Sequence, residues 1–225
     1  MKLAHIWPKI SVVIFTYNDP SGVKRALDSL VRQDYPQDKL EIVVIDNGSK
    51  DNSAAVARKY TRNLSVDPSR DGPAMRARGI RKATGEYIYI VYEQDMEMIS
   101  RDFLKQLVRP LLEEEQLVAS FTREYPHPKQ PWVVRFVSYD SIQRDPLIQF
   151  LTPSIDDTIV ESRDTYKICY FKKFKIPPVT HMLFRKSFLQ NSGTWMQERD
   201  YDHDTIVKLV DFGCHLFAYV PAAGI

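Results

Sequence analysis

The feature that most constrains this fold is a regular alternation of strand-like and helix-like segments over residues 1–121. Apolar, β-branched runs at 9–15 and 40–46 are typical of buried strands, and each is followed by a polar turn. Apolar residues at helical spacing come next in both cases. Alternation of this kind predicts an α/β fold with a Rossmann-like, mostly parallel sheet and helices on both of its faces.

The remaining elements extend this pattern. The expected strands span 9–15, 40–46, 63–66, 87–92, 117–121 and 215–220, and the expected helices 23–33, 51–60, 72–85, 102–115 and 201–213. A further strand and the start of a helix are expected within 176–189. Gly85 and Gly213 are expected to close the third and last helices. Residues 122–175 show no clean period and are expected to be mobile or partly helical.

Composition excludes several classes of protein. The net charge of +2 and the pI near 8.4 give no argument for nucleic-acid binding. The two cysteines, Cys169 and Cys214, are not in a C-x-x-C pair, so neither a zinc site nor a redox motif is predicted. No window approaches 18 consecutive apolar residues, and the first ten residues lack a signal-peptide core. A cytoplasmic protein is expected. The basic cluster Lys167, Lys172, Lys173 and Lys175 is expected to be a solvated face.

Polar residues follow three of the predicted strands, in the stretches "TYND", "DNGS" and "EQD". Parallel strands end at the same edge of a sheet, and ligands of open α/β sheets bind outside these carboxyl ends. The sequence therefore predicts a ligand site at this edge.

Glu93 and Asp95 follow the strand "YIYIVY" and are two residues apart. In an extended strand such residues share a face, and two adjacent carboxylates repel unless a cation joins them. A hard divalent ion such as Mg²⁺ or Mn²⁺ suits oxygen ligands and commonly adds substrate phosphates. The alternative is a solvated acidic turn.

Asp46 ends the second predicted strand, and Asn47-Gly48 follows it. An Asx-type turn explains this sequence without a ligand. The functional alternative is a carboxylate that accepts a hydrogen bond from a nucleobase. Tyr17, at the neighbouring strand end, could pack against a base or simply cover the core.

These segments resemble family 2 glycosyltransferases with the GT-A fold. The resemblance lies in "SVVIFTYND", "EIVVIDNGSKDNS", "RARGIRKATGEYI" and "YEQD", in this order and spacing, and resumes in "RDYDHDTIVKLVDFGCHLFAYVPAAGI". The segment "EQDMEMISRDFLKQLVRPLL" is most similar to a rhamnosyltransferase-like branch. The resemblance implies a single GT-A domain over 1–225, with a nucleotide-sugar-binding half at 1–121 and an acceptor-side half at 122–225.

The resemblance also implies roles for individual residues. Thr16, Tyr17 and Asp46 would hold the base and ribose of a nucleotide sugar, and Arg76 would approach the nucleotide. Asp95 would be the main metal ligand, assisted by Glu93, and Asp202 the general base. Two neighbours of these residues, Asn18 and Gln94, are included among those expected to bind the nucleotide sugar.

Four positions depart from the family pattern, namely Phe15, Ala77, Glu93 and Tyr201. Because Tyr201 replaces the usual glutamate, Asp200 and Asp204 remain rival bases, and all three aspartates could instead cap a helix. His181, His203, Trp132 and Trp195 are weaker candidates, and Trp195 is the better placed of the two tryptophans.

The activity implied is an inverting, metal-dependent transfer of a sugar from a nucleoside diphosphate sugar to a saccharide or lipid-linked acceptor. Peripheral membrane association is a further expectation, and the oligomeric state is left open. Relatives commonly continue past the segment "VPAAGI", so a truncated or minimal form is expected. A non-catalytic nucleotide-sugar-binding domain is the main alternative. A sugar nucleotidyltransferase and a dinucleotide dehydrogenase each need a glycine-rich loop after the first strand, where only Gly22 occurs.

Overall fold

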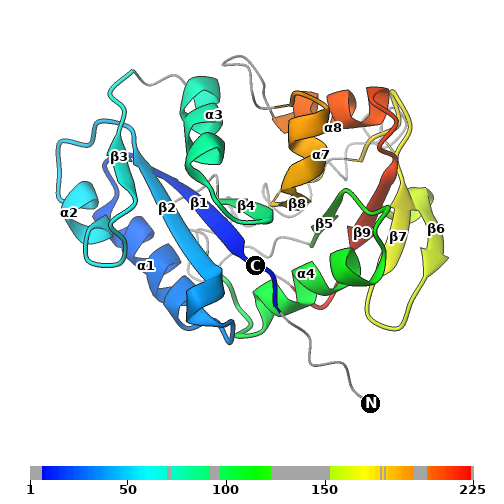
Figure 1. Cartoon of the computed structure of the whole chain (residues 1–225), viewed down its shortest axis with the longest axis horizontal. Helices are drawn as coiled ribbons and strands as arrows, with labels where there is room; N and C mark the ends of the chain where they lie inside the picture. The colour runs from blue at the N-terminus through cyan, green and yellow to red at the C-terminus, as the bar shows by residue number, and fades with distance from the viewer. Residues whose placement is uncertain are drawn as a thin grey trace, which may run out of the picture.

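The protein forms one nine-stranded sheet with helices on both faces (Figure 1). The structure is a computed structural model of the 225-residue chain and describes residues 7–69, 72–91, 97–122, 153–177, 179, 181–194 and 202–223. The described strands are β1 (Ile10–Thr16), β2 (Leu40–Asp46), β3 (Leu64–Val66), β4 (Tyr87–Val91), β5 (Ala119–Phe121), β6 (Ile159–Ser162), β7 (Lys167–Tyr170), β8 (Leu183–Arg185) and β9 (Leu216–Tyr219). The described α-helices are α1 (Pro20–Val31), α2 (Ser53–Ala57), α3 (Gly72–Lys82), α4 (Phe103–Glu113), α7 (Lys186–Asn191) and α8 (Asp202–Asp211).

The sheet has the strand order β3-β2-β1-β4-β8-β5-β9-β7-β6. The first four strands are parallel, as the alternation of strands and helices predicts. β8 runs antiparallel to both of its neighbours, and β7 runs antiparallel to β9 and β6. The α/β class with a mostly parallel sheet is therefore confirmed, and its antiparallel strands lie in the second half of the chain.

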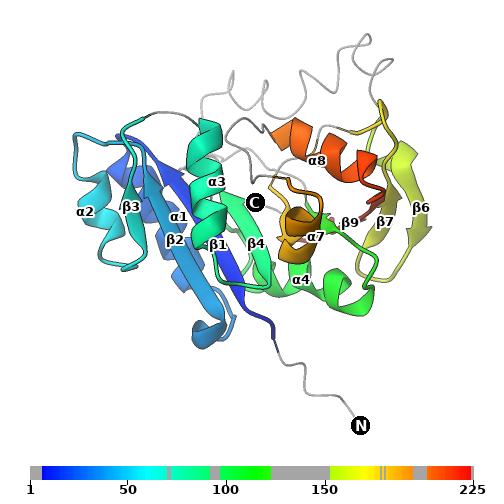
Figure 2. The same cartoon turned by 45° about the horizontal axis from the view of Figure 1, so that its top comes forward.

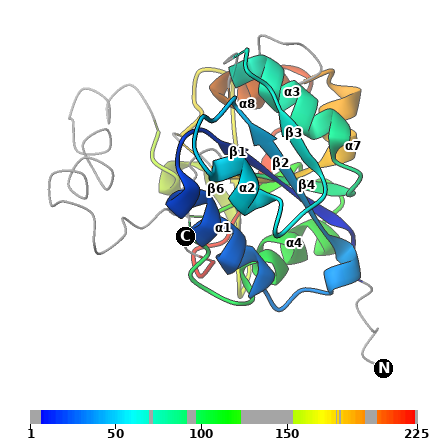
Figure 3. The same ribbon diagram turned by 90° about the vertical axis from the view of Figure 1, so that its left-hand side faces the viewer.

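Alternate residues of β1 divide the core into two layers. Val12 and Ile14 belong to a buried cluster with residues of α1 and α4, whereas Val13 belongs to a second cluster with residues of α3 and α8. Figure 3 shows α1 and α4 on one side of the sheet and α3, α7 and α8 on the other. A central strand that is buried on both faces needs apolar residues throughout, and this explains the run "ISVVIF".

Two expectations about local structure are wrong. Gly85 does not close α3, which ends at Lys82; instead its N–H donates to Ser11 Oγ at 2.8 Å. A Cβ at position 85 would lie 2.6 Å from the backbone nitrogen of Ser11, so glycine is required for close approach to β1. Within the expected irregular segment 122–175, residues 159–170 form the β6–β7 hairpin. β6 is an edge strand with three exposed residues out of four, and this removes the apolar alternation that marks a strand.

The expectation that Gly213 closes the last helix holds: α8 ends at Asp211, and Gly213 follows with φ of 95°. Cys169 and Cys214 are buried free thiols. No helix in the described part of the chain combines the length and apolarity needed to cross a bilayer.

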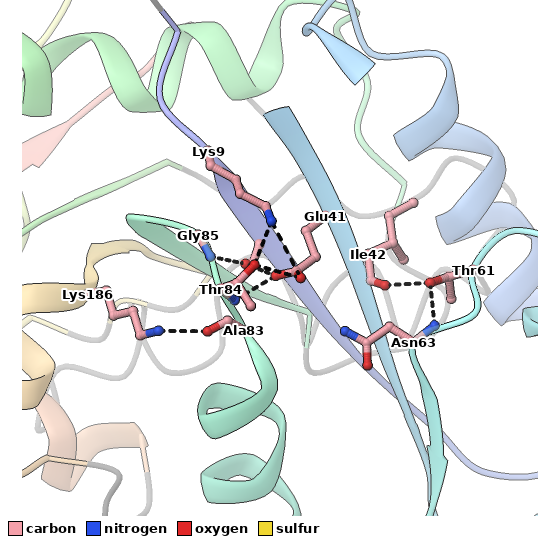
Figure 4. A network of polar contacts seen from close by, with 10 residues as sticks. Lys9, Glu41, Ile42, Thr61, Asn63, Ala83, Thr84, Gly85 and Lys186 are labelled. Carbon is pink, nitrogen blue, oxygen red and sulfur yellow. Dashed lines mark hydrogen bonds and ion pairs between the residues drawn. The ribbon is translucent and has the colours of Figure 1, made fainter. Parts of the chain in front are cut away.

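A polar network joins the amino-terminal ends of β1, β2 and β4 (Figure 4). Both carboxylate oxygens of Glu41 accept hydrogen bonds from Thr84, at 2.7 Å from N–H and 2.8 Å from Oγ1. Ser11 Oγ also donates to Glu41, and Lys9 Nζ lies 3.8 Å from it. The network links the residues that follow α3 to the amino-terminal edge of the strands.

Replacing Glu41 with glutamine is expected to lower the free energy of unfolding at neutral pH by about 1–3 kcal/mol, since a charged acceptor is lost. Burial tends to raise the pKa of Glu41, but hydrogen bonds from Ser11 and Thr84 and the charge of Lys9 together hold it below its ordinary value of 4.5. The lowered pKa stabilises the fold above about pH 4.5, and this contribution is lost as the pH falls through the folded-state pKa.

Urea denaturation as a function of pH checks this prediction. The stability of E41Q should fall less steeply below pH 4.5 than that of the wild type. The exposed Glu115→Gln serves as the matched control and should follow the wild type. Equal pH dependence in E41Q and the wild type would contradict the proposed role of this carboxylate.

Candidate functional site

Thr16 and Asp46 lie side by side at the carboxyl edge of the sheet. They are partners in the parallel register of β1 and β2, and each is the last residue of its strand. The N–H of Asn47 donates to the carbonyl of Thr16 at 2.8 Å, so the ladder extends one residue beyond the strands. Both residues are buried, with exposed fractions of 2% and 1%. The structure thus brings together two of the predicted site residues.

The side chain of Asp46 is fixed by a tight turn. Ser49 donates to it twice, from N–H to Oδ2 at 3.0 Å and from Oγ to Oδ1 at 2.5 Å. Gly48 has φ of 72°, and a Cβ there would lie 3.0 Å from Cα of Pro68. Glycine is therefore favoured both by the backbone conformation and by this close approach. These bonds come from the third residue after Asp46, whereas an Asx-type turn bonds to the second, and together they orient the carboxylate.

Asn18 joins the loops that follow β1 and β2. Its N–H donates to Ser49 Oγ at 3.0 Å, and its Oδ1 accepts from the N–H of Lys50 at 2.8 Å. Asn18 adopts a left-handed conformation with φ of 47°, which asparagine tolerates better than most residues. Its side-chain oxygen is thus engaged in holding the two loops together. Tyr17, the residue before it, is half-buried.

Arg76 lies on α3 and is nearly buried, at 9% exposure. The helix packs closely on β1 because Gly79 lacks a side chain: a Cβ there would lie 2.5 Å from Val13. Arg76 is three residues earlier, about 4.5 Å along the helix axis. Helical side chains tilt toward the helix N-terminus, and a Cβ built on Gly72 would be 4.0 Å from Nη2 of Arg76. Since α3 returns antiparallel to the strands, this direction leads toward their carboxyl edge.

Asp67 is a buried carboxylate at this edge that the sequence analysis did not identify. It follows β3, its N–H donates to the carbonyl of Asp46 at 2.7 Å, and Arg78 Nη1 lies 3.1 Å from its Oδ2. Hydrogen bonds from Ser69 and the charge of Arg78 hold the pKa of Asp67 below its ordinary value, despite the opposing effect of burial. The sequence pattern that predicts the other site residues also applies to Asp67, since it is a polar residue directly after a predicted strand.

The acidic segment lies outside the described residues, which include neither Glu93, Gln94 nor Asp95. The structure describes the chain on both sides of it. Val91, the last residue of β4, pairs with Ile14 of β1, and Glu97 Oε1 accepts from Arg32 Nη2 at 2.9 Å. Among the described residues, no group of three or more histidine, cysteine, aspartate or glutamate side chains could hold a metal ion.

Asp202 is the first residue of α8, and its side chain is outside the description, as are those of His203 and Asp204. Asp200, Trp132 and Trp195 lie in segments that the structure does not describe. His181 is buried, at 5% exposure. The relation of the predicted base to the Thr16–Asp46 edge therefore stays a prediction.

The model of one protein family, described as Glycosyl transferase family 2, matches residues 11–190. Similar curated proteins include the glycosyltransferase AglE of Haloferax volcanii, 33% identical over 84 residues, which cover 35% of this chain and 28% of AglE. The poly(ribitol-phosphate) β-N-acetylglucosaminyltransferase TarS of Staphylococcus aureus is 32% identical over 103 residues, which cover 43% of this chain and 18% of TarS. The matches thus span less than a third of the length of either relative.

Solved structures share the fold. A mannosyltransferase from Pyrobaculum calidifontis, in complex with GDP-Man and Mn²⁺, superposes with a TM-score of 0.67 at 22% identity and covers 98% of this chain and 56% of its own. A structure of residues 1–349 of TarS with UDP-GlcNAc superposes with a TM-score of 0.65 at 18% identity, over 96% of this chain and 57% of its own. At these identities the likeness establishes the fold.

Proposed function

The chain belongs to glycosyl transferase family 2, and on that basis we propose that it moves a sugar from a nucleoside diphosphate sugar to an acceptor hydroxyl. One observation carries this proposal: a buried carboxylate, Asp46, is fixed beside Thr16 at the carboxyl edge of the parallel strands. This edge is where open α/β sheets bind their ligands.

The donor nucleotide is assigned to residues from three elements. Asp46 accepts a hydrogen bond from the base, Thr16 contacts the base or ribose, and Tyr17 packs against the ring. Arg76 approaches the nucleotide from α3. Asn18 supports this site by joining the loops that follow β1 and β2, as its hydrogen bond from the N–H of Lys50 indicates. Gln94 completes the set expected to bind the donor.

A divalent ion, Mg²⁺ or Mn²⁺, is assigned to Asp95 with help from Glu93. Asp95 follows Val91 by four residues, and four residues span at most about 14 Å. Since Val91 pairs with Ile14, the covalent chain limits the distance of Asp95 from the edge that holds Thr16. Carboxylate oxygens fit a hard divalent ion. Bound there, such an ion would neutralise charge that develops on the leaving diphosphate.

Asp202 is assigned as the base that removes the proton from the acceptor hydroxyl. A single base on the side of the sugar opposite to the leaving group gives inversion at the anomeric carbon. Asp202 is the first residue of α8. Asp200 and Asp204 remain rivals for this role.

The acceptor is proposed to be a saccharide or a lipid-linked hydroxyl compound, and the protein to act in the cytoplasm. Both proposals rest on the family alone. The bound donors of the neighbouring structures, GDP-Man and UDP-GlcNAc, belong to those proteins. The rhamnosyltransferase-like branch also stays a prediction.

Asp46→Asn is expected to weaken binding of the preferred nucleoside diphosphate by roughly 10- to 100-fold, since a hydrogen bond to a buried charged group contributes about 1.5–3 kcal/mol. Calorimetric titration in the presence of Mn²⁺ measures the effect. Asp51→Asn is the matched control: this carboxylate is exposed in the loop after β2 and accepts a hydrogen bond from Ser53 at the start of α2, and its replacement should leave the affinity unchanged.

Because Asp46 is buried, Ser49→Ala provides a second variant that keeps the carboxylate but removes one of its donors. We expect an intermediate loss of affinity with a melting temperature near that of the wild type. Wild-type affinity in both variants would exclude Asp46 from the nucleotide site.

A donor screen tests the function itself. Uridine, guanosine and thymidine diphosphate sugars are first compared by thermal shift with Mn²⁺, and release of free nucleoside diphosphate is then measured for each donor that binds. Slow, metal-dependent release from at least one donor is expected. Binding without release under any acceptor condition would favour a non-catalytic nucleotide-sugar-binding domain.

A further inference from the structure

The segment 172–175, with the sequence Lys-Lys-Phe-Lys, forms a tight turn after β7 that we call the basic turn. An isolated antiparallel bridge pairs Lys172 with Lys175, and the N–H of Lys175 donates to the carbonyl of Lys172 at 2.9 Å. Phe174 at its tip has φ of 63° and is 86% exposed. All four residues of the turn are exposed.

The base of the basic turn is anchored in the core. Phe171 is fully buried, its ring stacks on Phe217 with centroids 4.5 Å apart, and its N–H donates to the carbonyl of His215 at 2.9 Å. Ile176, on the other side, is also buried. A firmly held base means that the projection of Phe174 is a fixed feature of the fold.

The conformation of Phe174 is doubly unfavourable in water. A left-handed backbone is uncommon for a residue other than glycine, asparagine or aspartate, and a large aromatic ring is left in solvent. Outliers of this kind are maintained where the surrounding structure imposes them, and they concentrate at functional surfaces. A binding partner that takes up the ring would account for an exposed phenylalanine at this position.

A second exposed aromatic side chain belongs to the same surface. Lys173 Nζ lies 3.0 Å from Oδ2 of Asp211, the last residue of α8, and Phe212, the next residue, is 56% exposed. Figure 2 shows the chain that follows β7 passing beside this end of α8. Two exposed rings thus lie on adjacent segments, with lysines around them.

The charge of this surface is positive. Lys173 pairs with Asp211, but within the described part of the chain Lys172 and Lys175 form no ion pair. Lysine ammonium groups around projecting aromatic rings match the chemistry of an anionic lipid surface, which attracts the charges and accepts the rings among its headgroups. The turn is a projecting tip, and a lipid surface adapts to such a shape without a complementary groove.

We propose that the basic turn, together with Phe212, docks this protein onto an anionic phospholipid surface, with the ring of Phe174 inserted among the headgroups. The basic turn lies at the C-terminal end of α8, whereas Asp202 begins this helix, and its ten residues span about 15 Å. Membrane contact at the basic turn therefore leaves Asp202 at the other end of α8. Vesicle binding can be measured whether or not Asp202 is the catalytic base.

Sedimentation with vesicles tests the proposal on the full chain. The protein is expected to bind vesicles of phosphatidylglycerol and phosphatidylcholine in equal amounts, and to bind phosphatidylcholine alone at least about tenfold more weakly, because each lysine near the surface adds to the attraction. Binding should also weaken as salt is added.

Two variants separate the contributions of the ring and the charge. Phe174→Ser keeps the charge and Lys175→Glu keeps the ring, and each is expected to weaken binding to the mixed vesicles by at least about fivefold. Ile99→Ser, which replaces another exposed apolar residue, and Lys59→Glu, which reverses another exposed lysine, are matched controls and should bind as the wild type does.

Three outcomes would overturn the proposal. The first is no vesicle binding by the wild type, and the second is equal binding by the wild type and both turn variants. The third is a concentration-dependent dimer, seen by sedimentation velocity without vesicles and lost in Phe174→Ser, since the surface would then be an interface between copies of the chain.

Discussion

Asp95→Asn should lower turnover of the preferred donor by roughly 10²- to 10³-fold, because a metal ion contributes several kcal/mol of charge stabilisation when the diphosphate leaves. An asparagine keeps the size of the side chain and removes the charge that is proposed to hold the ion. Release of nucleoside diphosphate measures the loss, and EDTA should reproduce it in the wild type.

Glu97→Gln is the matched control for this experiment. Glu97 lies two residues beyond Asp95, and Arg32 donates to its Oε1 at 2.9 Å. An exposed ion pair contributes little to stability, so turnover of this variant should stay close to that of the wild type. Full turnover in Asp95→Asn, or in wild type treated with EDTA, would remove the metal ion from the account.

Asp202→Asn should lower kcat by roughly 10²- to 10⁴-fold and leave the affinity for the donor nucleotide unchanged, since a general base acts on the acceptor proton. Single-turnover measurements with a saturating donor separate this loss from a binding defect. The same substitution at Asp204 is the matched comparison, because it lies in the same helix two residues later.

The comparison with Asp200 and Asp204 decides which aspartate is the base. If Asp202→Asn retains wild-type turnover while one of the rivals loses it, the base is reassigned without change to the rest of the account. If all three variants remain active, none of the three aspartates is the base.

Local sequence patterns predicted the first half of the fold well. β1 and β4 are buried along nearly all of their length and β2 over its last four residues, so each contains an apolar run, and α1 shows a clear apolar period. The regular pattern also predicts where the two strands end. β1 and β2 are parallel neighbours of seven residues, and their last residues, Thr16 and Asp46, are partners in the register. The polar residues that follow the two strands therefore lie close together.

The second half of the sheet was harder to predict because its strands are short or lie at the edge. β8 has only three residues and inserts antiparallel between β4 and β5, which no local pattern reveals. β6 is largely exposed, so Glu161 and Ser162 interrupt the apolar signal. Gly85 was misassigned because a glycine near a helix end suggests a cap, whereas its contact is with Ser11, 74 residues away.

Part of the candidate site depended on contacts that sequence alone cannot supply. Ser49 was visible in the turn motif, but its two bonds to Asp46 require the folded turn. Asp67 meets Asp46 only because β3 pairs with β2, and it meets Arg78 only because α3 crosses that edge. The proposed metal ligands and base stay predictions, since they rest on the family pattern.

The most direct test is an anomalous difference map from crystals grown with Mn²⁺ and the nucleoside diphosphate that the protein binds best. We expect a manganese peak coordinated by Asp95 and the diphosphate, with the nucleobase beside Asp46 and Thr16. A nucleotide bound elsewhere on the sheet, or manganese coordinated without Asp95, would contradict it.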